Sequence, residues 1–275
     1  MKIYISADIE GISGVVKGAQ TSETGHDYER ARRLMTEEVN AVIRGAKAAG
    51  ARDILVNDSH GPMTNIIIED LDEDARLISG NKKLHGMMEG LDESFDAIMF
   101  IGYHARHNTS GVLSHTYYGS VISEVEINGE VIGESEFNAY LGGYFGVPVV
   151  MVSGDNVLSY QVKNLNEKIE TVIVKKAHSR YTAECIHPKK VHKILEEAAE
   201  KVLSSNYKKN IGTCKIEGQV VLEMAFLNSG MAEATLFIPG VEIIAPNRIR
   251  YVAKDIVEAY KMRMGITTLA ASTLK

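Results

Sequence analysis

The sequence predicts an α/β fold, with a mostly parallel sheet covered by helices on both faces and a smaller C-terminal α+β unit. Up to about residue 176, short apolar runs typical of buried strands alternate with helical patterns. This alternation is characteristic of a parallel sheet with helices packed on both faces. Three of the runs also end in acidic residues or histidines, at the strand edge where open α/β sheets bind ligands.

Five strands and one long helix are expected in this first part. The expected strands are 2–7, 52–57, 96–102, 148–153 and 169–175. The clearest helix covers 28–49, where apolar residues such as Leu34 and Val39 recur at helical spacing between charged ones. Gly50 then stands where a helix often ends.

A hairpin interrupts this alternation. Residues 124–134 alternate with a period of two around Asn128-Gly129, which is the strongest short-range signal for a β-hairpin. The hairpin leads into an expected helix at 135–145 and brings Glu134 to its start. An acidic residue in the first turn usually complements the helix dipole at the surface, so Glu134 taken alone is a weak site candidate.

The pattern changes after residue 176. The expected elements are a helix at 187–203, strands at 219–227, 234–238 and 248–252, and a helix at 255–269. Strands followed by a closing helix suggest a smaller α+β unit packed on the first domain. We therefore divide the chain into a metal-binding α/β domain, 1–183, and an α+β domain, 184–275. The second has no cluster of ligand-type residues, so we expect it to serve as scaffold, substrate wall or oligomer contact.

Composition argues against several classes of partner. The chain has 30 basic and 36 acidic residues, a formal net charge of -6, and no dense basic stripe, so nucleic acid is not expected as a partner. Cys185 and Cys214 lie in unrelated contexts, which supports neither a disulfide framework nor a cysteine zinc site. An N-terminal strand in place of a signal peptide, and no apolar run near the roughly 20 residues of a membrane span, predict a soluble cytoplasmic protein without membrane contact.

The residues at the strand ends have the chemistry of metal ligands. Asp8 and Glu10 follow the first strand, and if the chain stays extended they point to the same side. Two carboxylates aimed alike repel unless a cation neutralises them, although a solvated turn would explain this motif equally well. His60 and His104 follow two further strands, and imidazole suits zinc. Together with Glu134 they are enough ligands for a two-metal centre, whose bridging water would hydrolyse an amide or ester.

Other polar residues near the strand ends have several interpretations. His115 lies in a loop of small and polar residues and could act as an acid or base, as a donor to an oxyanion, or as an exposed loop residue. Asp58 could hydrogen-bond a ligand histidine. Asp155 is expected to cap a helix. Arg106 and His107 could bind a substrate carboxylate, but we expect them first as surface residues.

Familiar motifs of other enzyme classes are absent from the sequence. There is no Gly-x-Gly-x-x-Gly after the first strand, no Walker A sequence, no Gly-x-Ser-x-Gly and no His-Glu-x-x-His. These absences argue against nicotinamide enzymes, nucleoside triphosphatases, serine hydrolases and zincins.

The segment 6–14, Ser-Ala-Asp-Ile-Glu-Gly-Ile-Ser-Gly, resembles the Ser-x-Asp-x-Glu-Gly signature of the zinc-dependent D-aminopeptidases associated with bacterial dipeptide transport operons. The resemblance extends over essentially the whole chain, through residues 35–38, 56–60, 77–80, 89–92, 102–106, 114–115 and 133–134, and more loosely 148–155 and 253–255.

The resemblance implies a dinuclear zinc centre and a closed assembly. Asp8 would bridge two zinc ions, and the remaining ligands would be Glu10, His60, His104 and Glu134. His115 matches the histidine that the family treats as catalytic. We expect it to transfer a proton or stabilise an oxyanion, because a metal-bound hydroxide already supplies the nucleophile. The family forms a homodecamer with an internal chamber, which would admit only short peptides.

The sequence therefore predicts a zinc metallopeptidase, an aminopeptidase that hydrolyses short peptides with an N-terminal D-amino acid through a dinuclear zinc-bound hydroxide. Mn²⁺ or Co²⁺ would also suit these ligands. The alternatives are a related metallohydrolase with another substrate, such as an L-aminopeptidase, an amidase or a phosphoesterase, and a non-catalytic metal-binding assembly protein. A phosphoesterase would need a basic residue beside the ions, and among the candidates only Arg106 is placed for that role.

Overall fold

The larger of two sheets has seven strands in the order β3-β2-β1-β4-β7-β8-β9. The computed structural model describes residues 1–204 and 210–274. The strands are β1 (Lys2–Ala7), β2 (Asp53–Asp58), β3 (Ala75–Ile78), β4 (Ala97–Ile101), β7 (Val149–Asp155), β8 (Glu170–Ser179) and β9 (Thr182–Cys185). All neighbours pair in parallel except β9, which is antiparallel to β8. Strands β3 and β9 were not expected from the sequence.

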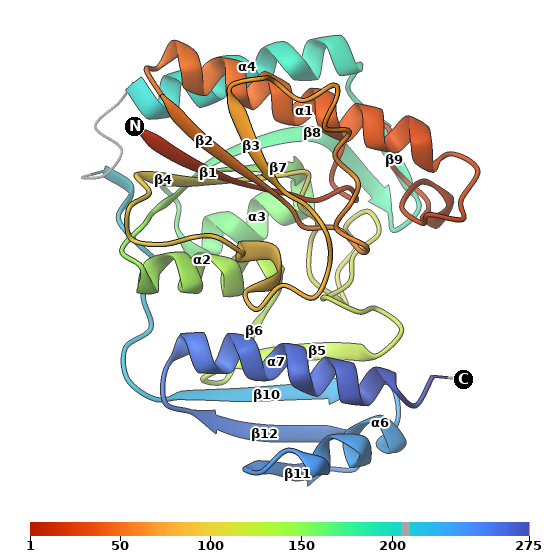
Figure 1. Cartoon of the computed structure of the whole chain (residues 1–275). Helices are drawn as coiled ribbons and strands as arrows, with labels where there is room; N and C mark the ends of the chain where they lie inside the picture. Colours follow the sequence, from red (N-terminus) through yellow and green to blue (C-terminus); the bar gives the residue numbers. More distant parts are fainter. Residues whose placement is uncertain (205–209, 275) are drawn as a thin grey trace.

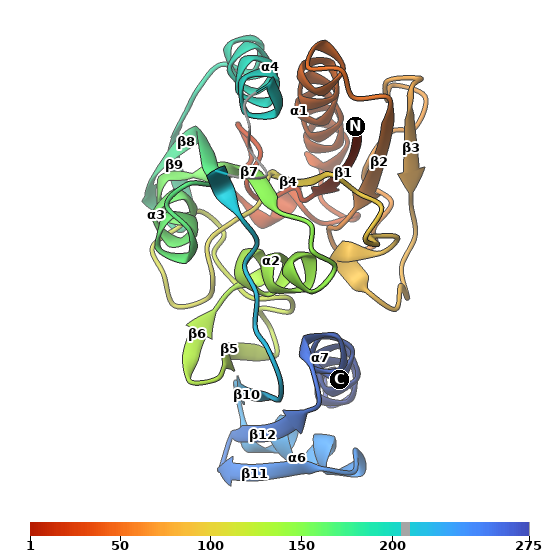
Figure 2. The ribbon, with the colours of Figure 1, turned by 90° about the vertical axis from the view of Figure 1, so that its left-hand side faces the viewer.

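Helices cover both faces of this sheet, as Figures 1 and 2 show. Helices α1 (Tyr28–Ala48) and α4 (Pro188–Ser204) lie on one face, and α2 (Glu134–Tyr144) and α3 (Asn156–Leu165) lie on the other. The central strands β1, β4 and β7 are buried along nearly their whole length because both of their faces are covered. The predicted fold class is confirmed.

A second, antiparallel sheet has the order β11-β12-β10-β5-β6. Its strands are β5 (Ile122–Ile127), β6 (Glu130–Ile132), β10 (Val220–Phe226), β11 (Val241–Ala245) and β12 (Arg248–Ala253). The expected hairpin forms β5 and β6, with Asn128 and Gly129 at φ 53 and 85°, as a tight turn of this kind requires. It pairs with β10, so it belongs to the second sheet. Arg248 forms ion pairs with Glu124 and Glu126 across this sheet.

One expected strand of the C-terminal part is wrong. Residues 234–238 were expected to be extended, but Ala234–Phe237 forms a 3-10 helix that continues α6 (Ser229–Glu233). Asn228 starts this helical segment by accepting a hydrogen bond from the amide of Met231 at 3.1 Å. Leu236 and Phe237, which are adjacent in this run, are 52% and 85% exposed, whereas in a half-buried strand one of two successive side chains would be buried.

The closing helix and the short helical turns complete the chain. Helix α7 (Ile256–Ala271) lies between the second sheet and α2, and Asp255 caps its start by accepting from the amide of Glu258 at 2.8 Å. Two short 3-10 helices are Gly18–Gln20 and Gly86–Met88. Among the described residues, no helix combines the length and the hydropathy that a membrane span requires.

A single boundary near residue 183 does not follow the two sheets. Helix α4 lies after that point but packs on α1 of the first unit, whereas β5 and β6 lie before it but pair in the second sheet. The division into 1–183 and 184–275 stays a prediction. By strand pairing, the chain enters the second sheet twice, once at 122–132 and again after α4.

Gly45 gives a test of the α1–α4 contact. An added Cβ would lie 2.2 Å from the carbonyl oxygen of Glu196. Helix propensity alone would make Gly45→Ala stabilising by about 1 kcal/mol, but overpacking costs about 1–3 kcal/mol. We expect a net loss in the free energy of unfolding, measured by urea denaturation. Gly18→Ala, where the added atom meets nothing within 4 Å, is the control; a gain in stability for Gly45→Ala would contradict this packing.

Candidate metal centre

Strands β1, β2 and β4 end level with one another. In the parallel register Ala7 pairs with Asp58 of β2 and with Ile101 of β4, so the three chains leave the sheet side by side. The chain goes from β1 to β2 on one side and later returns to β4 on the other, which makes this edge a topological switch point. Ligands bind at such points because the strand ends diverge there and leave a crevice.

Asp8 and Glu10 converge on His60, but through a turn. Strand β1 ends at Ala7, so the expected extended continuation is wrong, and the amide of Gly11 donates to the carbonyl of Gly102 at 2.7 Å. An added Cβ on Gly11 would lie 1.9 Å from a backbone oxygen, so the close crossing needs glycine. Nδ1 of His60 lies 3.3 Å from Oδ1 of Asp8 and 2.9 Å from Oε2 of Glu10.

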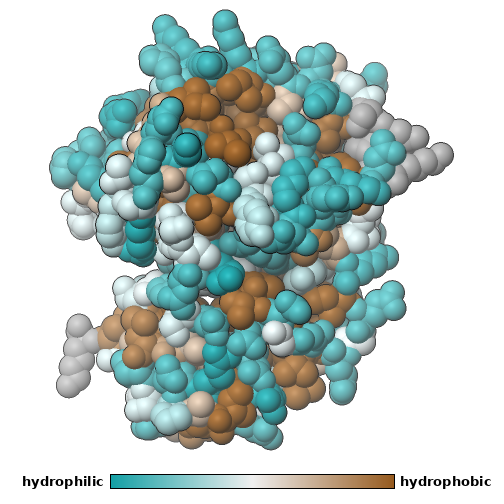
Figure 3. Space-filling model, turned by 180° about the vertical axis from the view of Figure 1, so that it is seen from behind, coloured by the Kyte–Doolittle hydropathy of each residue, from teal (hydrophilic) through white to brown (hydrophobic). Residues whose placement is uncertain are grey.

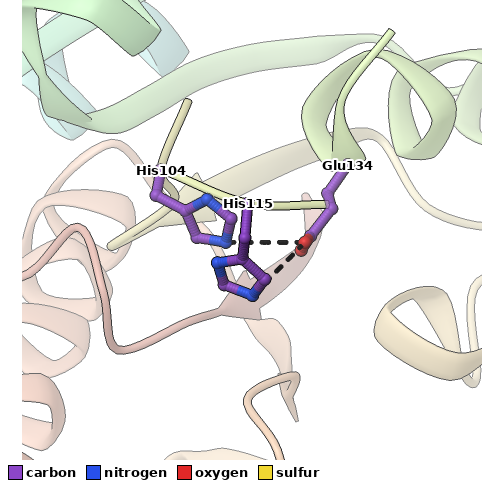
Figure 4. Close-up of side chains that lie close together, drawn as sticks. All are labelled: His104, His115 and Glu134. Carbon is purple, nitrogen blue, oxygen red and sulfur yellow. Dashed lines mark ion pairs between the residues drawn. The ribbon is translucent and has the colours of Figure 1, made fainter. Parts of the chain in front are cut away.

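His104, His115 and Glu134 form the other half of the cluster (Figure 4). Nε2 of His104 lies 3.5 Å from Oδ2 of Asp8 and 3.5 Å from Oε1 of Glu134. The rings of His104 and His115 stack with centroids 4.1 Å apart, and Nε2 of His115 lies 4.0 Å from Oε1 of Glu134. Glu134 sits in the first turn of α2 and also accepts the amide of Tyr117 at 2.6 Å. All six predicted site residues therefore lie in one cluster.

Burial makes the charges of this cluster depend on one another. Burial and then repulsion from Glu10 raise the pKa of Asp8 to about 8. Burial opposes charge on His104, but Glu134 and Asp8 raise its pKa to about 10. Burial and the nearby charge of His104 lower the pKa of His115. Without a cation, protons on the imidazoles thus neutralise the carboxylates, which is the role that a metal ion would take over.

The donor set fits zinc. Two sets of three residues could each hold an ion, because within each set the ligand atoms all lie within 4.8 Å of one another. One set is Asp8, Glu10 and His104, and the other is His104, His115 and Glu134. Oε2 of Glu10 is buried, and its 2.9 Å contact with Nδ1 of His60 does not have hydrogen-bond geometry, so a coordinating cation would satisfy it. Carboxylate oxygens and imidazole nitrogens are common zinc ligands.

Backbone carbonyls orient the histidine rings. Nε2 of His60 lies 2.7 Å from the carbonyl oxygen of Thr21, and Nδ1 of His104 lies 3.0 Å from that of Ala105. If each of these nitrogens carries the proton, Nδ1 of His60 and Nε2 of His104 remain as ligands facing the carboxylates. Outer hydrogen bonds of this kind fix the tautomer of metal-binding histidines.

A buried lysine that sequence reasoning missed holds the loop after β1. Nζ of Lys175, on β8, donates to the carbonyl oxygens of Glu10, Ile12 and Val15 at 2.5, 3.0 and 2.6 Å. Burial lowers its pKa to about 8. A lysine inside an otherwise apolar strand pattern was the signal available, but nothing local indicates which loop it reaches.

Glu38 fixes the same loop from α1. Its Oε1 accepts the amide of Ser13 at 2.9 Å, and burial raises its pKa to about 7. The turn that carries Asp8 and Glu10 is thus held by one buried cation from β8 and one buried acid from α1.

Four other candidate residues lie outside the cluster. Asp58 accepts the amides of Asn65 and Ile66, and so fixes the loop after His60; the expected hydrogen bond to a ligand histidine is wrong. Asp155 caps α3 by accepting the amides of its first turn, as expected. Arg106 lines a different cavity, and its Nη1 donates to the carbonyl of His107 at 3.3 Å. Arg106 is therefore not the basic residue beside the ions that the phosphoesterase alternative needs.

The cluster opens into a cavity of about 490 Å³. One wall carries Asp8, His60, His115 and Glu134, and another is formed by residues 263–271 of α7. The cavity therefore lies between the two units, with the ligands on the first and part of its lining on the second.

A histidine and carboxylate cluster at the switch point of a parallel α/β sheet, open to a cavity, defines a metal-dependent hydrolase. The comparisons with known proteins specify the class: the family model Peptidase_M55, described as D-aminopeptidase, matches residues 1–264. The chain belongs to the D-aminopeptidase family, and the resemblance seen in the sequence is confirmed.

The relatives match over their whole length. A D-aminopeptidase of Bacillus subtilis (strain 168) is 39% identical over 274 residues, which are 99% of each chain. The solved structure of the Zn-dependent D-aminopeptidase DppA from Bacillus subtilis, described as a self-compartmentalizing protease, superposes with a TM-score of 0.96 at 38% identity and covers 100% of both chains.

Lys175→Met should loosen the centre as well as the fold. It leaves three buried carbonyls without their donor, so we expect a loss of about 2–4 kcal/mol in the free energy of unfolding. Because the loop carries Asp8 and Glu10, zinc affinity should fall by about 10- to 100-fold, measured by calorimetric titration of the metal-free protein. The exposed neighbour Lys176→Met is the control. Unchanged zinc affinity in the folded Lys175→Met protein would contradict this role.

Proposed function

We propose that this protein is a zinc-dependent aminopeptidase that hydrolyses short peptides with an N-terminal D-amino acid. The observation that carries the proposal is the buried cluster of acidic residues and histidines at one end of a cavity of about 490 Å³, a size suited to a small ligand. Family membership and the relatives' activity support the choice of a peptide over an ester or a phosphate.

We propose two metal ions per subunit. Asp8 is suited to bridge them because its two carboxylate oxygens face different histidines, His60 through Oδ1 and His104 through Oδ2. Glu10 lies on the His60 side and Glu134 on the His104 side. When bound, the ions would supply Lewis acidity and lower the pKa of a water molecule between them. Zn²⁺ is favoured by the relative, and Mn²⁺ or Co²⁺ would accept the same donors.

His115 is proposed to hold and move a proton. Its Nδ1 lies 3.0 Å from the carbonyl oxygen of Leu113, which leaves Nε2 directed toward Glu134 and the cavity. With its pKa lowered by burial, the neutral ring can accept a proton near neutral pH and return it to the leaving amine. The free α-amine of the substrate would be attracted by the acidic cluster.

We propose that the protein works as a closed homo-oligomer, with a decamer as the specific expectation. The relative DppA is described as self-compartmentalizing. The unit built on the second sheet exposes large apolar side chains that would suit subunit contacts, among them Leu227, Leu236, Phe237 and Val252, and Figure 3 shows hydrophobic surface on this lower part. A cytoplasmic location stays a prediction from the sequence.

The proposed activity is tested with matched D-Ala and L-Ala para-nitroanilides and dipeptides, before and after chelation. We expect cleavage that favours D-Ala, is lost on chelation, and returns in proportion to zinc until two equivalents per chain are bound. Equal or L-favoured cleavage would reject the chirality. No cleavage by fully metallated protein would reject the peptidase in favour of another hydrolase or a non-catalytic assembly protein, and in the latter chelation would unfold the chain.

His115→Ala should lower kcat by about 10²- to 10⁴-fold because a positioned acid or base is lost. Zinc stoichiometry, measured by metal analysis after dialysis, should stay at two per chain, since His115 is not among the proposed ligands. His178→Ala, at an exposed position, is the control. Loss of one zinc ion in His115→Ala would instead make His115 a ligand.

A further inference from the structure

Arg263 places a buried positive charge in the cavity of the metal centre. It comes from α7 and is 6% exposed, and it lines the same cavity as Asp8 and Glu134. The guanidinium carbon lies 3.6 Å from the ring centroid of Tyr117 and 4.8 Å from that of Tyr260. Two aromatic rings therefore hold the plane of the guanidinium in place.

This charge has no counterion in the described part of the chain. Nε and Nη2 of Arg263 are buried and make no hydrogen bond, and among residues 1–204 and 210–274 no carboxylate forms an ion pair with it. The guanidinium does interact with the side chain of Tyr260 through a hydrogen bond, but this partner is a phenol and not an acid. A buried guanidinium without an anion costs free energy, and its retention indicates a ligand that supplies the anion.

Arg263 also stands close to the metal ligands. Tyr117 connects the two, because its amide donates to Oε1 of Glu134 at 2.6 Å while its ring packs on the guanidinium. In a peptide bound with its amine at the acidic cluster, the residue after the cleaved bond spans only about 3.5 Å. A group that binds the end of such a peptide has to lie in the same cavity as the metal ligands, and Arg263 lines that cavity with Asp8 and Glu134.

We propose that Arg263 binds the terminal carboxylate of a dipeptide substrate and so makes the enzyme selective for dipeptides with a free C-terminus. The planar guanidinium matches a carboxylate with two parallel N–H donors. This inference rests on the proposed aminopeptidase function. It assigns the recognition of the leaving residue to α7, whereas the bond is broken at the strand ends.

The test compares D-Ala-Gly with its C-terminal amide, since the achiral second residue removes any effect of its configuration. The zinc-loaded protein should cleave the acid with a kcat/KM about 10- to 100-fold above that of the amide, mostly through KM. In Arg263→Met this preference should vanish by loss of activity on the acid, and Arg263→Lys should restore part of it. Lys261→Met, an exposed cation two residues earlier on α7, should keep the full preference.

Two further measurements separate this inference from the function on which it rests. D-Ala para-nitroanilide has no carboxylate, so Arg263→Met should lose much less activity on it than on D-Ala-Gly. If the parent cleaves it but shows no preference between acid and amide, the role of Arg263 is overturned while the aminopeptidase stands; no cleavage at all rejects the function itself. A D-Ala-Gly analogue with a reduced peptide bond should bind the metal-free parent more tightly than its amide, and Arg263→Met should bind both alike.

Stability distinguishes binding from a structural role. Because Arg263 is an unpaired buried charge, Arg263→Met should have an unchanged or raised Tm and the same oligomeric state as the parent. A markedly lower Tm, or dissociation seen by size-exclusion chromatography, would mean that the arginine serves packing or a second copy of the chain, and would overturn the proposal. If the parent protein cleaves an amidated dipeptide with an acidic second side chain as well as it cleaves D-Ala-Gly, Arg263 recognises that side-chain carboxylate and not the C-terminus, and the proposal is overturned.

Discussion

The centre depends on the repulsion between carboxylates that the fold forces together. Asp8, Glu10 and Glu134 are each at most 5% exposed, so water cannot screen their charges. The pKa of His104 near 10 shows the cluster drawing positive charge toward itself, and a divalent ion meets that demand more fully than a proton. The surrounding structure has to hold these groups in contact whether or not the ion is bound, and this requirement explains several features that no single motif explains.

The first of these features is the support of the loop after β1. Lys175 and Glu38 bind its backbone from two different elements, and Gly11 lets it cross the start of the β4 loop at a distance that any other residue would prevent. Each contact alone would be an ordinary buried polar interaction. Together they remove the freedom that Asp8 and Glu10 would otherwise use to move apart, so the free energy stored in the repulsion is available to bind metal.

Local patterns predicted which side chains come together, because Asp8, His60 and His104 each closely follow a buried strand and parallel register brings these distant segments level. Their role as metal ligands stays a proposal. The hairpin at Asn128-Gly129 and the cap at Asp155 were predictable for the same reason: their signals lie within a few residues. The strand expected at 234–238 failed because an apolar run does not reveal whether it will find a pairing partner. Lys175 was missed because the loop that it binds is far along the chain, and Arg263 was missed because only the fold shows that it is buried and lines the cavity.

The cavity between the two units has a consequence for how such an enzyme can diversify. The proposed ligands lie at one end of the larger sheet, whereas α7, which lines the facing wall of the cavity, packs on the second sheet. Substitutions in α7 can therefore alter which peptides fit without replacing a ligand. Such substitutions leave the buried charged residues of the metal centre in place, so they do not abolish metal binding. Homologues with this fold can thus differ in the peptides that they accept while they keep the same residues at the metal centre.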